Sequence, residues 1–190
     1  MSNGDLKSQA ALGFFTVLEH EQQGLIGGYL ILNQAGRPLE FHCTAPVKAN
    51  RAQQILFGPT LESYLYGEQI GQTLLGKSAL EPLAVCTDVE LALTVRDYIS
   101  LPVALVLADE ESKCRAPAES WTWRVDAAHR AGAHLNQFAI GRNRLAVPTH
   151  READRQMIAA RLENVAGLDL SEPFERIREA VEEAHKGARS

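Results

Sequence analysis

Residues 82–109 constrain the fold of this chain more than any other stretch. Two apolar runs, Leu83–Cys86 and Leu101–Leu107, have the length and aliphatic content of strands that are buried on both faces. Between them, the apolar residues of Val89–Ser100 recur at helical spacing, and its polar residues point elsewhere. This order predicts a β-α-β crossover, which joins two parallel strands of one sheet.

The ends of the central helix carry local signals of their own. Asp88 stands where an N-cap residue belongs, because a short carboxylate can accept a hydrogen bond from the free amides of a first helical turn. Pro102 ends the helix near Ser100, because the residue before a proline is disfavoured in the helical conformation. We therefore predict a helix that starts directly after the first strand and stops directly before the second.

Three antiparallel strands are expected before this unit. Leu12–Leu18 is the first, and Gly24–Asn33 and Arg37–Val47 form a hairpin whose turn uses Gly36 for a positive φ. Gly27-Gly28, inside the second strand, predicts a bulge or a close approach of the backbone. The chain thus begins as an antiparallel sheet.

Helices are expected between the third strand and the crossover. Ala49–Phe57 predicts a short helix, which Gly58-Pro59 breaks before a longer helix over Thr60–Ser78. Small residues on one stripe of the longer helix would let it lie close to the sheet. That stripe consists of Tyr64, Gly67, Gly71 and Leu74.

The C-terminal half combines a second hairpin with helices. We predict a loop over Glu110–Ser120, a strand over Trp121–Val125 and a helical turn over Ala127–Ala133. A hairpin of His134–Ile140 and Arg144–Val147 follows. Thr149 and Glu152 have the spacing of a capping box, which opens a helix that reaches Val165. Ser171 caps a last helix with a narrow apolar stripe among Glu/Arg pairs.

The predicted fold class is α/β, with a mixed sheet of three antiparallel N-terminal strands, a β-α-β centre and a helical C-terminal part. At 190 residues with 45% hydrophobic residues, the chain can bury one good core. We predict a single domain over residues 1–190, with a flexible N-terminus at 1–10 and the helical part at 149–190.

Composition argues against several classes of function. The net charge of −5 gives no general attraction to nucleic acid or to an anionic membrane, so nucleic acid is a possible partner that charge does not favour. Three cysteines without paired spacing, Cys43, Cys86 and Cys114, indicate reduced thiols in the cytoplasm. Neither a signal peptide nor a run of 18 apolar residues is present, so no membrane partner is expected.

The order of the predicted strands and helices resembles the ribonuclease H-like superfamily over residues 12–107. This resemblance implies two divalent metals, Mg²⁺ or Mn²⁺, held by carboxylates on the first strand, the first long helix, the end of the fourth strand and a later helix. The corresponding acids here are Glu19 or Glu21, then Glu68, Asp88, and Asp154 or Glu152. Hard oxygen ligands suit such ions, which activate a water and stabilise the leaving oxygen.

The resemblance implies metal ligands at Glu19, Glu21, Glu68 and Asp88, and catalytic roles for Glu68, Asp88 and Asp154. Each acid also has a purely structural explanation in the sequence. Asp88 is a helix cap, Glu152 is the partner in a capping box, and Glu68 and Asp154 are acids on a helix surface. The sequence leaves both interpretations open.

A basic segment and a glycine-rich segment add two further candidates. Residues 129–161 carry six arginines and two acids, and four of these arginines are phosphate-binding candidates: Arg142, Arg144, Arg151 and Arg155. Gly71–Ser78 matches the pattern of a phosphate-binding loop, which would use Lys77 and Ser78 to bind a nucleotide. A true phosphate loop follows a strand and opens a helix, whereas this match continues a helical stripe and precedes Pro82.

Three functional hypotheses follow. The favoured one is a non-catalytic binding or assembly module whose C-terminal helix docks on a partner protein. The second is a divalent-metal-dependent nucleic-acid phosphodiesterase that uses the acids above and offers the arginines to phosphates. The third is nucleotide binding through Lys77 and Ser78.

Overall fold

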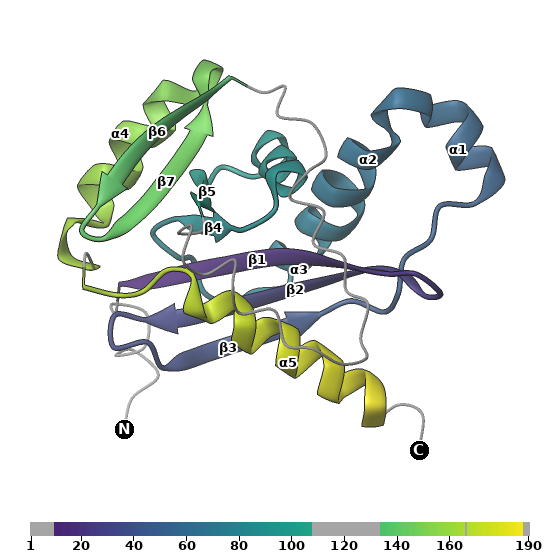
Figure 1. Ribbon diagram of the computed structural model, residues 1–190, viewed down its shortest axis with the longest axis horizontal. Helices are drawn as coiled ribbons and strands as arrows, with labels where there is room; N and C mark the ends of the chain where they lie inside the picture. Colours follow the sequence, from purple (N-terminus) through teal and green to yellow (C-terminus); the bar gives the residue numbers. More distant parts are fainter. Residues whose placement is uncertain (1–9, 108–133, 166, 188–190) are drawn as a thin grey trace.

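The computed structural model describes residues 10–107, 134–165 and 167–187. Residues 1–9 of the predicted flexible N-terminus lie outside these ranges, and so do the elements predicted over 110–133. Figure 1 shows the described part as a central sheet with helices on both of its faces.

Within the described residues, seven strands form one mixed sheet in the order β3-β2-β1-β4-β5-β7-β6. The strands are β1 Ala11–His20, β2 Gly24–Asn33, β3 Pro38–Cys43, β4 Val85–Thr87, β5 Val103–Leu107, β6 Leu135–Ile140 and β7 Asn143–Pro148. The first three strands pair antiparallel, β1, β4 and β5 are parallel, and β7 returns antiparallel to β5. The predicted α/β class and the antiparallel start are therefore confirmed.

Helices cover the two faces of the sheet separately. One face carries η3 (Tyr64–Gln72, a π-helix), α3 (Thr73–Leu75) and the 3₁₀ helix η4 (Glu90–Asp97), and the other carries α4 (Glu152–Arg161) and α5 (Glu172–Gly187). The remaining short elements are α1 Arg51–Phe57, η2 Gly58–Thr60, α2 Leu61–Ser63, η6 Thr149–Arg151 and η7 Glu163–Val165. Each helical layer buries one apolar cluster against the sheet.

The β-α-β centre has the predicted connectivity but different helix ends. β4 and β5 pair in parallel, with Val85 opposite Val103, and η4 connects them. The residue that precedes η4 is Val89, and no side chain caps the helix. The prediction that Asp88 is its N-cap is therefore wrong, and the carboxylate is free to serve another contact.

Close packing explains the glycines that the sequence singled out. A Cβ added to Gly28 would lie 2.3 Å from Ile177 Cγ2 of α5, and one added to Gly27 would lie 2.3 Å from Ile70 Cγ2 of η3. The predicted close approach at Gly27-Gly28 is confirmed, and the groups that lie against the two glycines are side chains of the covering helices. Gly71 meets Val95 of η4, so the small-residue stripe faces a helix and not the sheet as expected.

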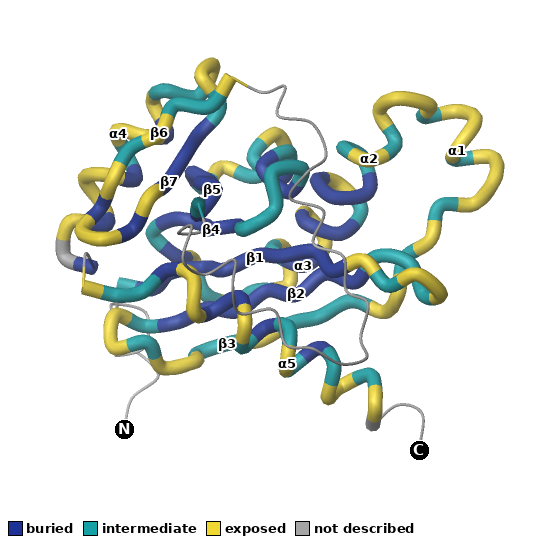
Figure 2. The backbone as a smooth tube through the Cα atoms, in the orientation of Figure 1, coloured by how far each residue is buried: buried dark blue, intermediate teal, exposed yellow. Residues whose placement is uncertain are grey.

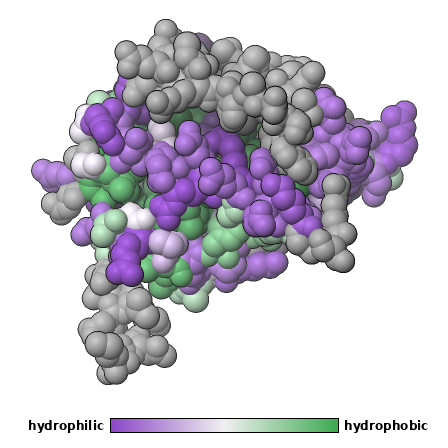
Figure 3. Space-filling view, turned by 60° about the horizontal axis from the view of Figure 1, so that its bottom comes forward, coloured by the Kyte–Doolittle hydropathy of each residue, from purple (hydrophilic) through white to green (hydrophobic). Residues whose placement is uncertain are grey.

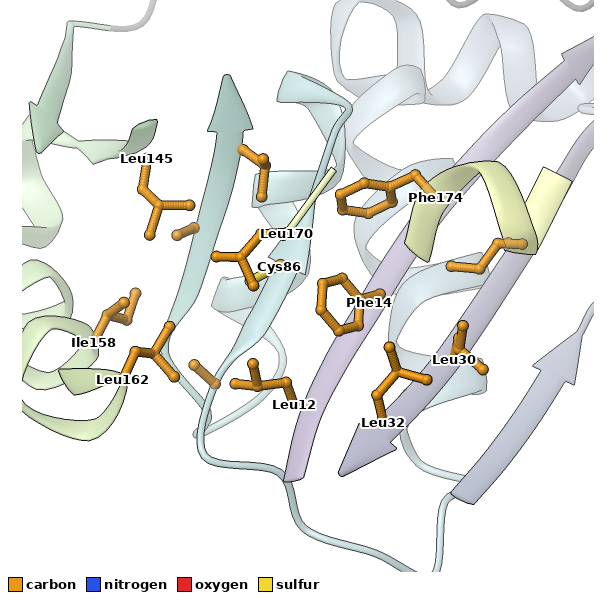
Figure 4. Packing of buried hydrophobic residues seen from close by; sticks show 14 of the residues in the cluster. Leu12, Phe14, Leu30, Leu32, Cys86, Leu145, Ile158, Leu162, Leu170 and Phe174 are labelled. Atoms are coloured by element: carbon orange, nitrogen blue, oxygen red, sulfur yellow. The ribbon is translucent and has the colours of Figure 1, made fainter. Parts of the chain in front are cut away.

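Helix α5 completes the core on its side of the sheet. Its apolar stripe lies over β1 and β2, where Phe174 meets Phe14 edge to face at 5.7 Å between ring centroids (Figure 4). Ile177 and Val181 are fully buried in the same cluster. The apolar stripe of α5, which was expected to dock on a partner, is thus covered by the protein's own sheet.

The second hairpin and α4 follow the predicted order. β6 and β7 pair around Gly141, whose φ of 57° allows the tight turn. The expected capping box is wrong, because α4 follows Arg151 without a side-chain cap and Glu152 accepts hydrogen bonds from Asn136 and Arg155 instead. None of the described helices is long and apolar enough to cross a membrane.

Candidate functional site

Asp88 lies at the end of β4 and pairs with an arginine 90 residues later in the chain. Its Oδ2 accepts a hydrogen bond from Arg178 Nη2 on α5, and the side chains of this ion pair are 15% and 27% exposed. The predicted metal ligand therefore already has a cationic partner. That partner comes from α5, the helix that lies over β1 and β2.

Thr16 and Asp88 both lie beyond the paired positions of β1 and β4. Phe14 of β1 is in register with Cys86 of β4, and Thr16 and Asp88 each lie two positions further along their own segments. Thr16 Oγ1 and Asp88 Oδ1 are buried, and neither has a hydrogen-bond partner among the described residues.

Asp154 occupies the opposite end of the parallel strands. Arg96 donates two hydrogen bonds to it, from Nε at 2.6 Å and from Nη2 at 3.1 Å, and a third to the Ile99 carbonyl at 2.7 Å. Arg96 and Ile99 belong to the segment that leads into β5, whereas Asp88 follows the carboxyl end of β4. The structure therefore does not bring these two acids together.

The other predicted acids are also dispersed. Glu19 and Glu21 are exposed at the tip of the β1-β2 hairpin, where Glu19 lies opposite Leu25. Glu68 is exposed on η3. It lies near Tyr98, whose pKa is raised first by burial and then by the carboxylates of Glu68 and Asp97 and a hydrogen bond with Glu68. Across the described ranges, no group of three or more His, Cys, Asp or Glu side chains could hold a metal ion.

The predicted phosphate-binding arginines form two separate pairs. Arg142 and Arg144 line a cavity of about 90 Å³ between β5, the β6-β7 turn and Ser171. Arg142 also lies 3.4 Å from Asp169, a mostly exposed contact that is worth little. Arg151 and Arg155 lie elsewhere and pair with Asp97 and Glu152.

Lys77 and Ser78 do not belong to a loop that follows a strand. Gly71 lies within the π-helix, and Lys77 and Ser78 follow the end of α3. The Ser78 hydroxyl hydrogen-bonds Glu40 Oε2 at 2.8 Å, next to a 3.1 Å contact between that oxygen and His42 Nε2. These contacts tie the segment after α3 to the edge strand β3.

The pKa of Glu40 reflects this network. Burial of the carboxyl would raise its pKa, but hydrogen bonds from His42, Ser78 and the Ala79 amide together outweigh burial and lower it. The carboxylate therefore stays ionised as the shared acceptor of three donors. This arrangement stabilises the join between β3 and the segment after α3.

Residues 48–60, which we call the arm, form a projection that the sequence did not identify as a site. They include α1, none of whose residues is buried, and Figure 1 shows α1 standing away from the sheet. Leu56 is 81% exposed and Ile55 is 66% exposed, more than any other large hydrophobic side chain among the described residues. Figure 2 shows the same helix almost entirely in the colour of exposed residues.

The arm is well ordered by its own contacts. Asn50 and Gln53 form a capping box, in which the Gln53 amide donates to Asn50 Oδ1 at 2.8 Å and the Asn50 amide donates to Gln53 Oε1 at 3.0 Å. At the other end, Phe57 stacks on Tyr64 with 4.0 Å between ring centroids. A helix this short is unstable alone in water, so these end contacts hold it in place.

No family model, curated protein or solved structure matches this chain. The described residues show two contrasting features: acids held in ion pairs, and an ordered arm with exposed apolar side chains.

Proposed function

We propose that this protein is a non-catalytic binding or assembly module whose arm docks on a partner protein. One observation carries the proposal: α1 is capped and stacked into a fixed position, yet it buries none of its residues. Short helices are rarely maintained without tertiary packing. An ordered helix with unpacked apolar side chains is typical of helix-in-groove recognition.

The exposed apolar side chains of α1 lie on one face. At about 100° per residue, Ala52, Ile55 and Leu56 fall within a third of a turn, while Gln53 and Phe57 point toward the body. The burial pattern agrees, since Gln53 and Phe57 are half-buried and the other three are exposed. We call Ala52, Ile55 and Leu56 the apolar face of the arm.

The arm replaces the C-terminal helix as the proposed contact with a partner. The apolar stripe of α5 packs on β1 and β2, so only its polar side is open to another molecule. The side of the molecule that includes α5 and β3 shows hydrophilic side chains among hydrophobic ones (Figure 3). We therefore assign the docking role to residues that the core does not need.

Leu56→Gln tests this function. Because Leu56 is mostly exposed and glutamine is a good helix former, we expect the free energy of unfolding to change by less than about 0.5 kcal/mol. Loss of an apolar anchor should weaken partner binding at least tenfold, which is about 1.4 kcal/mol or more. The partner is captured from an extract of the source cells, purified and titrated calorimetrically against the wild-type protein and the variant.

Gln54→Ala is the matched control for this experiment. Gln54 is on the same helix but faces away from Leu56, so the partner should bind this variant with wild-type affinity. Equal affinity of the partner for wild type and Leu56→Gln would contradict the proposal. So would an equal loss of affinity in both variants.

The metal-dependent phosphodiesterase stays the alternative, and a thermal melt with millimolar Mn²⁺ tests it. We expect no change in the melting temperature, because Asp88 already forms an ion pair with Arg178, and Asp154 already forms one with Arg96. A metal bound to a preformed site would stabilise the folded state by about 2.7 kcal/mol at a hundredfold excess over its Kd. A stabilisation of wild type that Asp88→Asn abolishes would favour the metal site over the binding module.

A further inference from the structure

We infer that the partner of the arm is a protein with a short apolar groove whose rim carries carboxylates. This inference rests on the proposed docking function and specifies the chemistry of the partner. It follows from the distribution of charge around the apolar face of the arm, from the size of that face and from the net charge of the whole chain.

The arm lies within a long segment of the sequence that contains no acidic residue. Residues 41–61 contain no Asp or Glu, although the chain has 24 acids in 190 residues and a net charge of −5. Within this stretch, Lys48 and Arg51 supply two positive charges at the start of α1. An acidic protein therefore presents its projecting helix with positive charge only.

The two cations have neutral hydrogen-bond acceptors. Lys48 Nζ donates to the Gln22 carbonyl, and Arg51 Nη1 donates to Gln54 Oε1 at a long 3.4 Å. Arg51 is exposed and lies about 40° around the helix from Ile55, so it flanks the apolar face. A carboxylate on a partner could therefore reach this guanidinium while Ile55 and Leu56 enter the groove.

The size of the apolar face favours a groove over a second copy of this chain. A seven-residue helix is about 10 Å long, and a stable symmetric dimer buries about 800 Å² on each partner. Two arms placed face to face would also bring their cations together. The small, positively charged face instead fits a concave acidic site that surrounds it.

The charge of the chain also favours a protein over an anionic membrane. Stable attachment of a short amphipathic segment to a membrane needs several basic residues or a second anchor. The arm offers two cations and two large aliphatic side chains, and the chain as a whole has a net charge of −5, which an anionic surface repels.

The experiment places a photoreactive benzophenone at exposed Ala52 and irradiates the source cells. The crosslinked protein is identified, purified and titrated with wild type, Arg51→Glu, Arg37→Glu and Leu56→Gln at low and high salt. Arg37 is exposed in the β2-β3 turn, so Arg37→Glu makes the same change of charge away from the arm. An acid in the first turn favours a helix, so Arg51→Glu should keep α1 folded.

We expect the affinity to fall at least tenfold in Arg51→Glu, to remain unchanged in Arg37→Glu, and to decrease with salt in wild type. Loss of binding in Leu56→Gln with equal affinities for the two arginine variants would overturn the acidic rim and leave the docking function intact. Crosslinks only to lipid or to a second copy, or no crosslink, would overturn both proposals. Binding of wild type to phosphatidylserine vesicles that Leu56→Gln abolishes would also overturn both.

Discussion

Arg96→Met is expected to destabilise the protein by about 3–5 kcal/mol. The substitution leaves the Asp154 carboxylate, whose side chain is 3% exposed, buried without the two hydrogen bonds and the positive charge that now compensate it. It also removes the donor to the Ile99 carbonyl. The free energy of unfolding, measured by urea denaturation followed by circular dichroism, should show this loss with an unchanged slope.

Two further variants separate the ion pair from general effects of the substitution. Arg151→Met breaks the ion pair with Asp97, whose side chain is 59% exposed, so its cost should stay below about 1 kcal/mol. The double variant Arg96→Met/Asp154→Leu removes both charges and should recover most of the stability. Similar costs for Arg96→Met and Arg151→Met would show that the buried pair contributes little to the stability of the fold.

Local patterns in the sequence predicted the sheet because the signals for its strands lie within each strand. The apolar runs that became β4 and β5, and the turn at Gly36 between β2 and β3, depend on neighbours a few residues away. The parallel pairing of β4 and β5 follows from the length of their connection, since a crossover must return to the same end of the sheet. These features needed no knowledge of distant contacts.

The role of Asp88 could not be predicted in the same way. An aspartate directly before a helix has the local signature of an N-cap, and also of a metal ligand at a strand end. Its actual partner, Arg178, is 90 residues away and reaches it only because α5 crosses β1 and β2. Likewise, sequence order gave no sign that Asp154 lies beside Arg96 at the other end of the parallel strands.

The arm and α5 show why apolar patterns do not identify a docking surface. Ile55, Leu56 and Phe57 look like a core segment in sequence, yet the first two are exposed on α1. The stripe of α5 looks like a docking face, yet Phe174 and Ile177 are buried. An amphipathic helix has the same sequence period whether it packs on its own sheet or on another protein, so only the tertiary structure separates the two cases.

Truncation of the chain after Leu170 is expected to abolish cooperative unfolding. It removes Phe174, Ile177 and Val181, which are at most 2% exposed, and uncovers the apolar face of β1 and β2. Loss of three such side chains costs on the order of 8 kcal/mol, which is comparable with the whole stability of a domain this size. We expect no thermal transition by near-ultraviolet circular dichroism, and strong binding of a hydrophobic dye.

Truncation after Glu183 is the matched control, because Val181 is the last residue of α5 in the apolar cluster. This shorter deletion should melt within a few degrees of wild type and should keep the Arg178 ion pair with Asp88. If the chain that ends at Leu170 melted as cooperatively as the control, α5 would be an appendage, and its apolar stripe would again be available for docking. If only the shorter deletion folds, α5 belongs to the core, and its apolar stripe is not available for docking.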